Sequence, residues 1–170
     1  MGQVWTYEGA PVTTAGFATG LVTLLEGTTF CICEPSGDMR SGGAQGLFVR
    51  DTRLISRLEL SINGEAPQPL SSQSREPFAR TFLSRMPPMP GLFDSTLLVA
   101  RQRVLNDGMQ EEISLRNLSG EPLPVTLRVG VAGDFADIFE VKEGRANAEM
   151  SLRTCVPWHS AQTISPRDAS

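Results

Sequence analysis

The chain has little of several residue types on which common protein functions depend. Among its 170 residues, Lys142 is the single lysine and His159 the single histidine, and aromatic residues make up 6% of the sequence. The formal net charge is −4, whereas nucleic-acid-binding domains carry clustered positive charge. The composition therefore argues against a nucleic-acid partner and against acid–base catalysis centred on histidine.

Long apolar runs are missing as well. No segment approaches the roughly 20 apolar residues of a membrane-spanning helix, and residues 1–20 have neither the basic start nor the apolar run of a secretory signal. We therefore expect a cytoplasmic protein without a membrane partner.

Cysteine is scarce and its spacing is unsuited to a structural metal site. Such a site takes four ligands with CxxC-type spacing, whereas this chain has Cys31, Cys33 and Cys155 beside its single histidine. Cys31 and Cys33 would share one face of a strand, and we expect buried, reduced thiols there. Signature motifs of serine hydrolases, zinc proteases, P-loops and dinucleotide sites are absent. The sequence predicts no metal, no cofactor and no catalytic residue.

What the chain does contain is alternation of apolar and polar residues in short segments. The alternation is clearest at 54–62, 109–118 and 125–131. Turn residues at Asn63–Gly64 follow the first of these segments, and turn residues at 106–108 precede the second. Further strand candidates are 22–25, 29–33, 65–70, 78–83, 95–105 and 150–156. Short strands with turn signals between them and no long helical pattern predict an all-β fold, an antiparallel β-sandwich with hairpin and meander connections.

Two local expectations refine this fold. Residues 54–62 should form one strand, and Asn63–Gly64, which accepts the positive φ angles of a type I′ turn, should return the chain as a hairpin along 65–70. Only 134–140 could form a helical turn, because its apolar residues Phe135, Ile138 and Phe139 recur at helical spacing.

The pattern divides the chain into three regions. Residues 1–20 are expected to form an irregular arm, and residues 21–146 a β-sandwich domain. Apart from its one strand candidate, 147–170 is an unpatterned tail. This tail is either a disordered end or part of a sandwich that is cut short.

The most unusual local feature lies between two apolar strand segments. A glycine-rich bend at 42–46 is followed by Leu-Phe-Val and then by Arg50, Asp51 and Arg53. Such a bend allows positive φ or a close approach of another segment. One interpretation is a solvated strand end in which Asp51 pairs with a flanking arginine. The other is that the three charged residues hold a loop at an interface or a sugar-binding cleft, since charge clusters are pointers to function.

A second charged group comes from carboxylates near residue 137. Asp134, Asp137 and Glu140 are close in sequence, and glycoside hydrolysis needs two carboxyl groups about 5 Å or roughly 6.5–9.5 Å apart. The three side chains either converge in space or belong to an ordinary acidic surface turn.

The motifs around these two features resemble a known family. The run from LLEGTTFCIC to SINGE, followed by EPFARTF, DSTLLVARQRVLNDGMQEEISLRNLSGEP and DFADIFEVKEGR, is similar to the N-terminal domain of bacterial glycogen debranching enzyme-like proteins of the amylo-α-1,6-glucosidase type. The resemblance extends from about Leu24 to Arg145 and keeps the order of the motifs. Its signature positions fall on 46–53 and 134–145.

The resemblance implies a β-sandwich that precedes an (α/α)6 barrel, with the catalytic carboxylates in the barrel. Because no such barrel follows in this sequence, we expect one domain of a longer enzyme or a shortened gene product, without hydrolase activity of its own. Its expected role is to pack on the catalytic barrel and shape an α-glucan cleft. The candidates for interface or substrate contacts are Arg50, Asp51, Arg53, Asp134 and Asp137. An independent α-glucan-binding module and a self-associating, homo-oligomeric structural domain are the alternatives.

Overall fold

The computed structural model describes residues 20–88, 96–146 and 150–158, with residues 75 and 151–158 described by their backbone. Its strands are β1 (Val22–Glu26), β2 (Thr29–Cys33), β3 (Gly46–Val49), β4 (Thr52–Ile55), β5 (Arg57–Ile62), β6 (Gln68–Glu76), β7 (Ala79–Arg85), β8 (Leu97–Leu105), β9 (Met109–Asn117), β10 (Val125–Gly133) and β11 (Met150–Trp158). One short helix, α1 (Ile138–Lys142), follows β10. The all-β prediction is confirmed.

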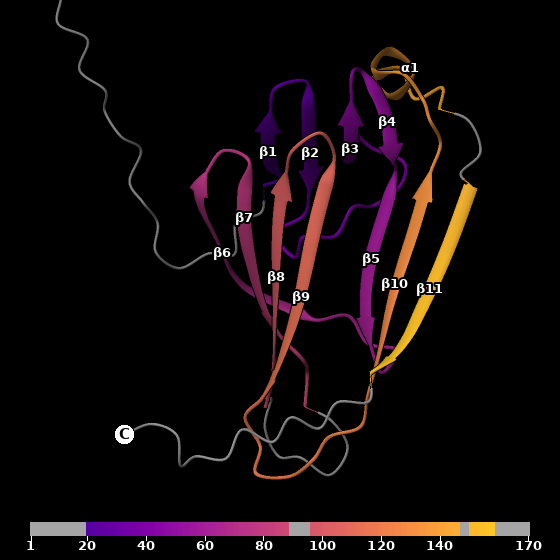
Figure 1. Cartoon of the computed structure of the whole chain (residues 1–170). Coiled ribbons are helices and arrows are strands. Elements are labelled where there is room, and N and C mark those ends of the chain that lie inside the picture. The colour runs from indigo at the N-terminus through magenta and orange to yellow at the C-terminus, as the bar shows by residue number, and fades with distance from the viewer. Residues whose placement is uncertain (1–19, 89–95, 147–149, 159–170) are drawn as a thin grey trace, which may run out of the picture.

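The strands form three antiparallel sheets, ordered β1-β2-β3-β4, β11-β10-β5 and β6-β7-β8-β9. The first and third follow the chain as meanders, whereas the second joins distant segments (Figure 1). The β6–β9 sheet forms one layer, and its side chains pack against both other sheets. This arrangement is the predicted sandwich.

Two clusters of buried side chains fill the space between the layers. The first lies under β1–β3 and contains Val22, Leu24, Cys31, Cys33, Met39, Leu47, Leu58, Phe82 and Leu105. The second lies between β5, β10 and the β8–β9 hairpin and contains Leu60, Ile62, Met86, Leu97 and Val99. Leu58, Leu60 and Ile62 all face inward, as the alternation of β5 predicts.

The prediction of a single strand over 54–62 is wrong, because the chain changes sheets in the middle. β4 pairs with β3, whereas β5 pairs with β10. Between them the buried Ser56 donates from its backbone N–H (2.8 Å) and from its hydroxyl (3.2 Å) to the Ala132 carbonyl. These two hydrogen bonds anchor the break to the end of β10, where Ala132 lies opposite Arg57.

The turn at Asn63–Gly64 forms, but the predicted hairpin does not. Both residues have positive φ, +52° and +87°, yet the returning chain makes only one bridge, between Ile62 and Glu65. β6 then begins at Gln68 and pairs with β7 instead of β5.

The reason is that the free edge of β5 already has another partner. Met39 exchanges backbone hydrogen bonds of 2.8 and 3.0 Å with Leu58, and the Asp38 carboxylate accepts the Leu60 N–H at 3.2 Å. A segment from the preceding loop thus occupies the edge that the hairpin strand would need.

The strand predicted at 150–156 is present and continues to Trp158. β11 pairs with β10 along its whole length, from Met150 opposite Gly133 to Trp158 opposite Val125. Part of the region expected as an unpatterned tail therefore belongs to the sheet. Within the described residues, no helix has the length and hydrophobicity needed to cross a membrane.

Candidate functional site

The two segments singled out in the sequence meet at one end of the sandwich. We call this region the corner; it comprises the β3–β4 turn (50–51) and the connection from β10 into α1 (134–137). The Arg53 N–H donates to the Ala136 carbonyl at 2.8 Å, and the Ile138 N–H donates to the Asp51 carbonyl at 2.9 Å. Figure 1 shows α1 beside the β3–β4 hairpin. Two segments that are more than 80 positions apart in the sequence are thereby held together by backbone hydrogen bonds.

A buried ion pair forms the base of the corner. Arg53 donates from Nε to Asp134 Oδ1 at 3.1 Å and from Nη2 to Asp134 Oδ2, and only 4% and 2% of the two side chains are exposed. Arg53 Nη1 also donates to the carbonyls of Gly43 (2.9 Å) and Gln45 (3.3 Å). A two-point Arg–carboxylate pair fixes orientation as well as distance. It therefore ties the glycine-rich loop to the end of β10.

The buried ion pair explains why one position of the glycine-rich bend must be glycine. A Cβ on Gly46 would lie 2.5 Å from the Ile55 carbonyl oxygen and 2.7 Å from Arg53 Cδ, and its φ of +148° also favours glycine. Gly46 is thus required because another backbone and the Arg53 side chain approach it closely.

The tip of the corner has an unusual backbone. Arg50 and Asp51 have φ of +48° and +65° at the two central positions of the β3–β4 turn, where asparagine and glycine are strongly preferred. Both side chains are exposed. The expected pairing of Asp51 with a flanking arginine does not form among the described residues, because Arg53 turns inward to Asp134.

The acidic group beyond β10 does not converge on one point. Asp134 faces inward, whereas Asp137 caps α1 by accepting the N–H groups of Phe139 (2.7 Å) and Glu140 (2.9 Å). The Glu140 carboxylate in turn accepts the Asp137 N–H at 3.0 Å, which completes a capping box. The helix predicted over 134–140 therefore exists but begins later, since Phe135 has a φ of +53°.

The apolar residues of this region are exposed, which the helical spacing did not predict. Phe135 is 58% and Phe139 68% exposed. Leu54 (38%) and Met150 (69%) are also exposed, and both adjoin Gly133. We call these four residues the apolar rim. A positive φ is an outlier for a bulky aromatic residue, so Phe135 combines backbone strain with an exposed ring.

A small pocket opens beside the corner. It has a volume of about 380 Å³ and is lined by Thr28, Thr29, Val49, Arg50 and Asp107. These residues come from the β1–β2 turn, the β3–β4 turn and the β8–β9 turn, so both layers of the sandwich contribute. We call it the mouth pocket.

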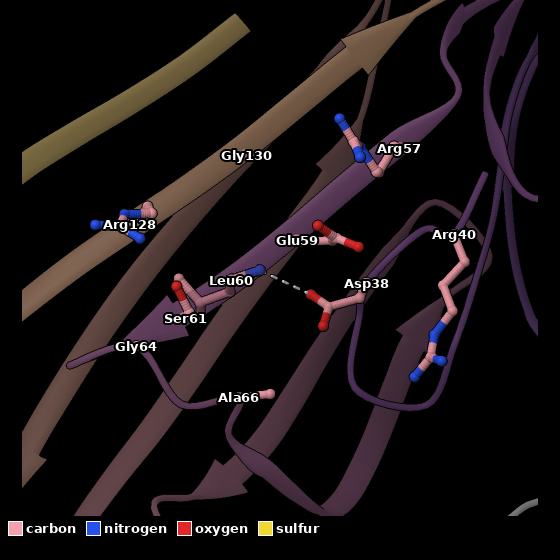
Figure 2. A pocket seen from close by; sticks show the side chains of 10 residues that line it. All are labelled: Asp38, Arg40, Arg57, Glu59, Leu60, Ser61, Gly64, Ala66, Arg128 and Gly130. Atoms are coloured by element: carbon pink, nitrogen blue, oxygen red, sulfur yellow. Dashed lines mark hydrogen bonds between the residues drawn. The ribbon is translucent and has the colours of Figure 1, made fainter. Parts of the chain in front are cut away.

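A second hollow of about 490 Å³ runs along the outer face of β5 and β10. Figure 2 shows Arg40, Arg57 and Arg128 around it, with their side chains pointing in different directions. Arg40 pairs with Glu34 at 2.7 Å. The arginines therefore do not converge on a common ligand position.

Charged residues also lie deep between the layers. Glu111 on β9 binds both Arg101 and Arg103 of β8, and Asp38 binds Arg101. The Arg103 side chain is fully buried and donates to the Gly37 carbonyl at 2.6 Å. Two arginines balance two carboxylates, which is the condition for burying such groups.

The predicted buried, reduced thiols are confirmed for Cys31 and Cys33. Cys31 Sγ lies 3.5 Å from Arg103 Nη1. A hydrogen bond with Cys33 lowers the pKa of Cys31 from 9.0 to about 7, the Arg103 charge acts in the same direction, and burial opposes both. The same thiol–thiol hydrogen bond, with burial, raises the pKa of Cys33. Nowhere in the described ranges do three His, Cys, Asp or Glu side chains gather as metal ligands would.

Comparison with known proteins gives the family of the chain. No curated protein matches it. The family model described as the N-terminal domain of (some) glycogen debranching enzymes matches residues 24–163. This match contains both halves of the corner, the mouth pocket and β11, and it continues beyond Arg145. The chain therefore belongs to the family of N-terminal domains of glycogen debranching enzymes.

Proposed function

We propose that this chain is a non-catalytic accessory β-sandwich that packs through its corner on the (α/α)6 catalytic domain of a debranching-type glycosidase and helps shape its α-glucan cleft. The observation that carries the proposal is strain combined with exposure. Arg50, Asp51 and Phe135 are three of the four non-glycine residues with positive φ in the described chain, and all three are exposed at the corner. Strain of this kind clusters at functional surfaces.

The chemistry of the corner suits a protein partner. Interfaces are anchored by a few aromatic and arginine side chains surrounded by polar residues. Phe135 and Phe139 supply exposed rings, and Arg50 supplies a guanidinium. The buried Arg53–Asp134 pair underneath holds them on a rigid base, which limits the ordering entropy lost on association.

The non-catalytic part of the proposal is supported by the contacts of the acidic residues. Each carboxylate of the acidic group already has a structural role, since Asp134 binds Arg53 and Asp137 and Glu140 close the capping box of α1. A catalytic acid needs a carboxyl group free to exchange a proton with the glycosidic oxygen. The catalytic pair is accordingly assigned to the partner domain.

The test is calorimetric titration of the chain into the separately produced catalytic domain of a glycogen debranching enzyme of this family. Saturable binding is expected for the wild type, and Phe135→Ser with Phe139→Ser should weaken it at least tenfold, since aromatic anchors each contribute about 2 kcal/mol or more. The matched control is Leu70→Ser with Leu118→Ser, which changes two leucines of 42% and 53% exposure away from the corner.

Equal weakening by both double variants, or none by the phenylalanine variant, would contradict docking through the corner. Light scattering of the chain alone distinguishes the self-association alternative. A dimer that disappears in the phenylalanine variant would assign the apolar rim to a second copy and overturn the proposal.

A further inference from the structure

We propose that the outer edge of β9 is a docking site for an extended segment of a protein partner, which adds to the β6–β9 sheet as an antiparallel strand. β9 is the last strand of this sheet (Figure 1), and no strand of the described chain pairs with its outer side. The corner is built from β3, β4 and β10 in the other sheets. The proposal therefore goes beyond docking through the corner and does not depend on it.

The two edges of the β6–β9 sheet differ in how well they are protected from pairing. β6 contains Pro69, and its register with β7 shifts twice, between Pro69 and Ser71 and between Ser74 and Glu76. Proline and β-bulges are devices that keep an edge strand from accepting another strand. β9 pairs with β8 without any register shift along its whole length, and it contains neither proline nor lysine. Its edge is thus regular and unprotected.

The backbone groups that point away from β8 belong to alternate residues of β9. In an antiparallel ladder, a residue directs its N–H and its carbonyl to the same side, and the next residue directs both to the other side. The Leu118 N–H donates to the carbonyl of Thr96, just before β8, at 2.8 Å. Even-numbered residues of β9 therefore bond to β8, whereas Glu111, Ile113 and Leu115 direct their backbone groups outward. An added strand would pair with these three residues.

The inner face of β9 has apolar side chains that the sandwich covers incompletely. Ile113 and Leu115 pack against the second buried cluster, yet both stay half-buried. Val99, which lies opposite Leu115 on β8, is fully buried, so the remaining exposure arises at the sheet edge. Apolar residues of an added strand would lie beside Ile113 and Leu115 on the same face and remove this surface from water.

The outer face of β9 carries two exposed charges of opposite sign, Glu112 and Arg116. Their cross-strand neighbours on β8 are Gln102 and Leu98, which have no charge. Towards an added strand, Glu112 and Arg116 occupy non-hydrogen-bonded positions, where opposing side chains approach most closely. Opposite charges in such pairs stabilise strand pairing and like charges weaken it. The partner is therefore expected to place a basic residue opposite Glu112 and an acidic one opposite Arg116.

These positions together define the chemistry of the partner segment. Because an antiparallel strand runs in the opposite direction, its acidic residue precedes its basic residue in sequence. Two apolar residues, opposite Leu115 and Ile113, flank a central residue opposite Ser114. The edge thus fits an extended segment with the order acidic, apolar, any residue, apolar, basic, in which main-chain hydrogen bonds supply affinity and the side chains supply specificity.

The experiment is calorimetric titration of the whole chain with the peptide Thr-Asp-Val-Thr-Val-Lys-Thr-Thr-Val, which has the length of β9. The matched control peptide has the aspartate and the lysine exchanged and so keeps the same composition. We expect saturable binding of the first peptide and about tenfold weaker binding of the second, since two attractive cross-strand pairs become repulsive. Glu112→Lys with Arg116→Glu should reverse this preference.

Methylation of the peptide nitrogens tests the backbone pairing separately. Methyl groups on the two valine nitrogens, opposite Leu115 and Ile113, remove donors that face β9 and should abolish binding. Methyl groups on the threonine nitrogens opposite Ser114 and Gln110 face away from β9 and should leave most of the affinity. Phe135→Ser with Phe139→Ser should bind both unmethylated peptides like the wild type, so failure of this proposal and failure of docking through the corner are distinguishable.

Four results would overturn the proposal: no binding of either unmethylated peptide, equal affinity for both, an unchanged preference in the charge-reversed variant, or equal loss from both patterns of methylation. Unfolding in urea confirms that the variants fold. Light scattering of the chain alone tests a second copy as the occupant. A dimer that dissociates in Glu112→Arg would assign the β9 edge to self-pairing and would also overturn the proposal.

Discussion

Two tight turns in this chain have similar backbones but opposite residue choices. At the far end of β5, Asn63 and Gly64 have φ of +52° and +87°, and at the corner Arg50 and Asp51 have +48° and +65°. Asparagine and glycine adopt these angles at little cost. Aspartate tolerates them less readily than glycine, and arginine disfavours them, so the corner keeps a conformation that costs more with its own residues than the Asn-Gly turn does.

The difference lies in where the side chains are used. Asn63 serves the fold, because its amide donates to the Pro124 carbonyl at 3.1 Å and accepts the Thr126 N–H at 2.7 Å. Arg50 and Asp51 are exposed, and the turn beneath them is held by Arg53 and Asp134. One turn is optimised for stability, whereas the other is held in place from below and presents charge to its surroundings.

The largest loss of stability should follow from breaking the Arg53–Asp134 ion pair beneath the corner. Arg53→Ala leaves the Asp134 carboxylate buried and unpaired, and removing one partner of a buried pair destabilises by about 3–5 kcal/mol. Urea unfolding followed by circular dichroism measures the loss. Asn63→Ala, which removes hydrogen bonds of an exposed side chain, should cost about 1 kcal/mol.

A double-mutant cycle sharpens this prediction. Arg53→Ala with Asp134→Ala should be less destabilising than the sum of the two single changes, because no charge is then left buried without its partner. Strict additivity would show that the pair does not support the corner.

A smaller, pH-dependent change in stability should arise from Cys31, which lies between the layers. The pKa of Cys31 is about 7 in the fold against 9.0 ordinarily, so the unfolded chain holds more protons between these values. The unfolding free energy should therefore rise from pH 7 to 9 and lose this contribution as the pH falls through 7. Above pH 9 the raised pKa of Cys33 reverses the slope.

Urea midpoints at pH 6.5, 7, 8 and 9 measure this dependence, with Cys31→Ser as the reference that lacks the group. The groups that face Cys31 are Cys33, Arg103 and Glu111. A slope shared by wild type and Cys31→Ser would assign the effect to other residues. Asp51→Gly should keep the wild-type slope, since the corner is not involved.

The fold was predictable because alternation and turn residues act locally. Leu58, Leu60 and Ile62 face inward as the period of two requires, and β11 appears where its strand was expected. The break at Ser56 was not predictable, because it depends on the Ala132 carbonyl from a distant strand. β6 was placed wrongly for a similar reason, since its polar sequence gives no alternation and its partner is fixed by the occupied edge of β5.

The site was predictable in its residues but not in its connections. The charges at 50–53 and 134–137 stood out in the sequence, yet no local pattern could show that Arg53 would bind Asp134 and leave Arg50 outside. The exposed Phe135 and Phe139 were missed because helical spacing indicates a buried face.

The smallest predicted change in stability comes from exchanging aspartate and glycine between the two turns. Asp51→Gly should stabilise the chain by about 0.5–1 kcal/mol, because glycine accepts positive φ without strain. Gly64→Asp should destabilise it by a similar amount, and a Cβ there meets no atom within 4 Å, so the loss comes from backbone strain and not from a steric clash. Urea midpoints measure both. If Asp51→Gly stabilises the fold while weakening docking to the catalytic domain severalfold, the strain at the corner serves binding; a destabilising Asp51→Gly would mean that the aspartate itself supports the turn.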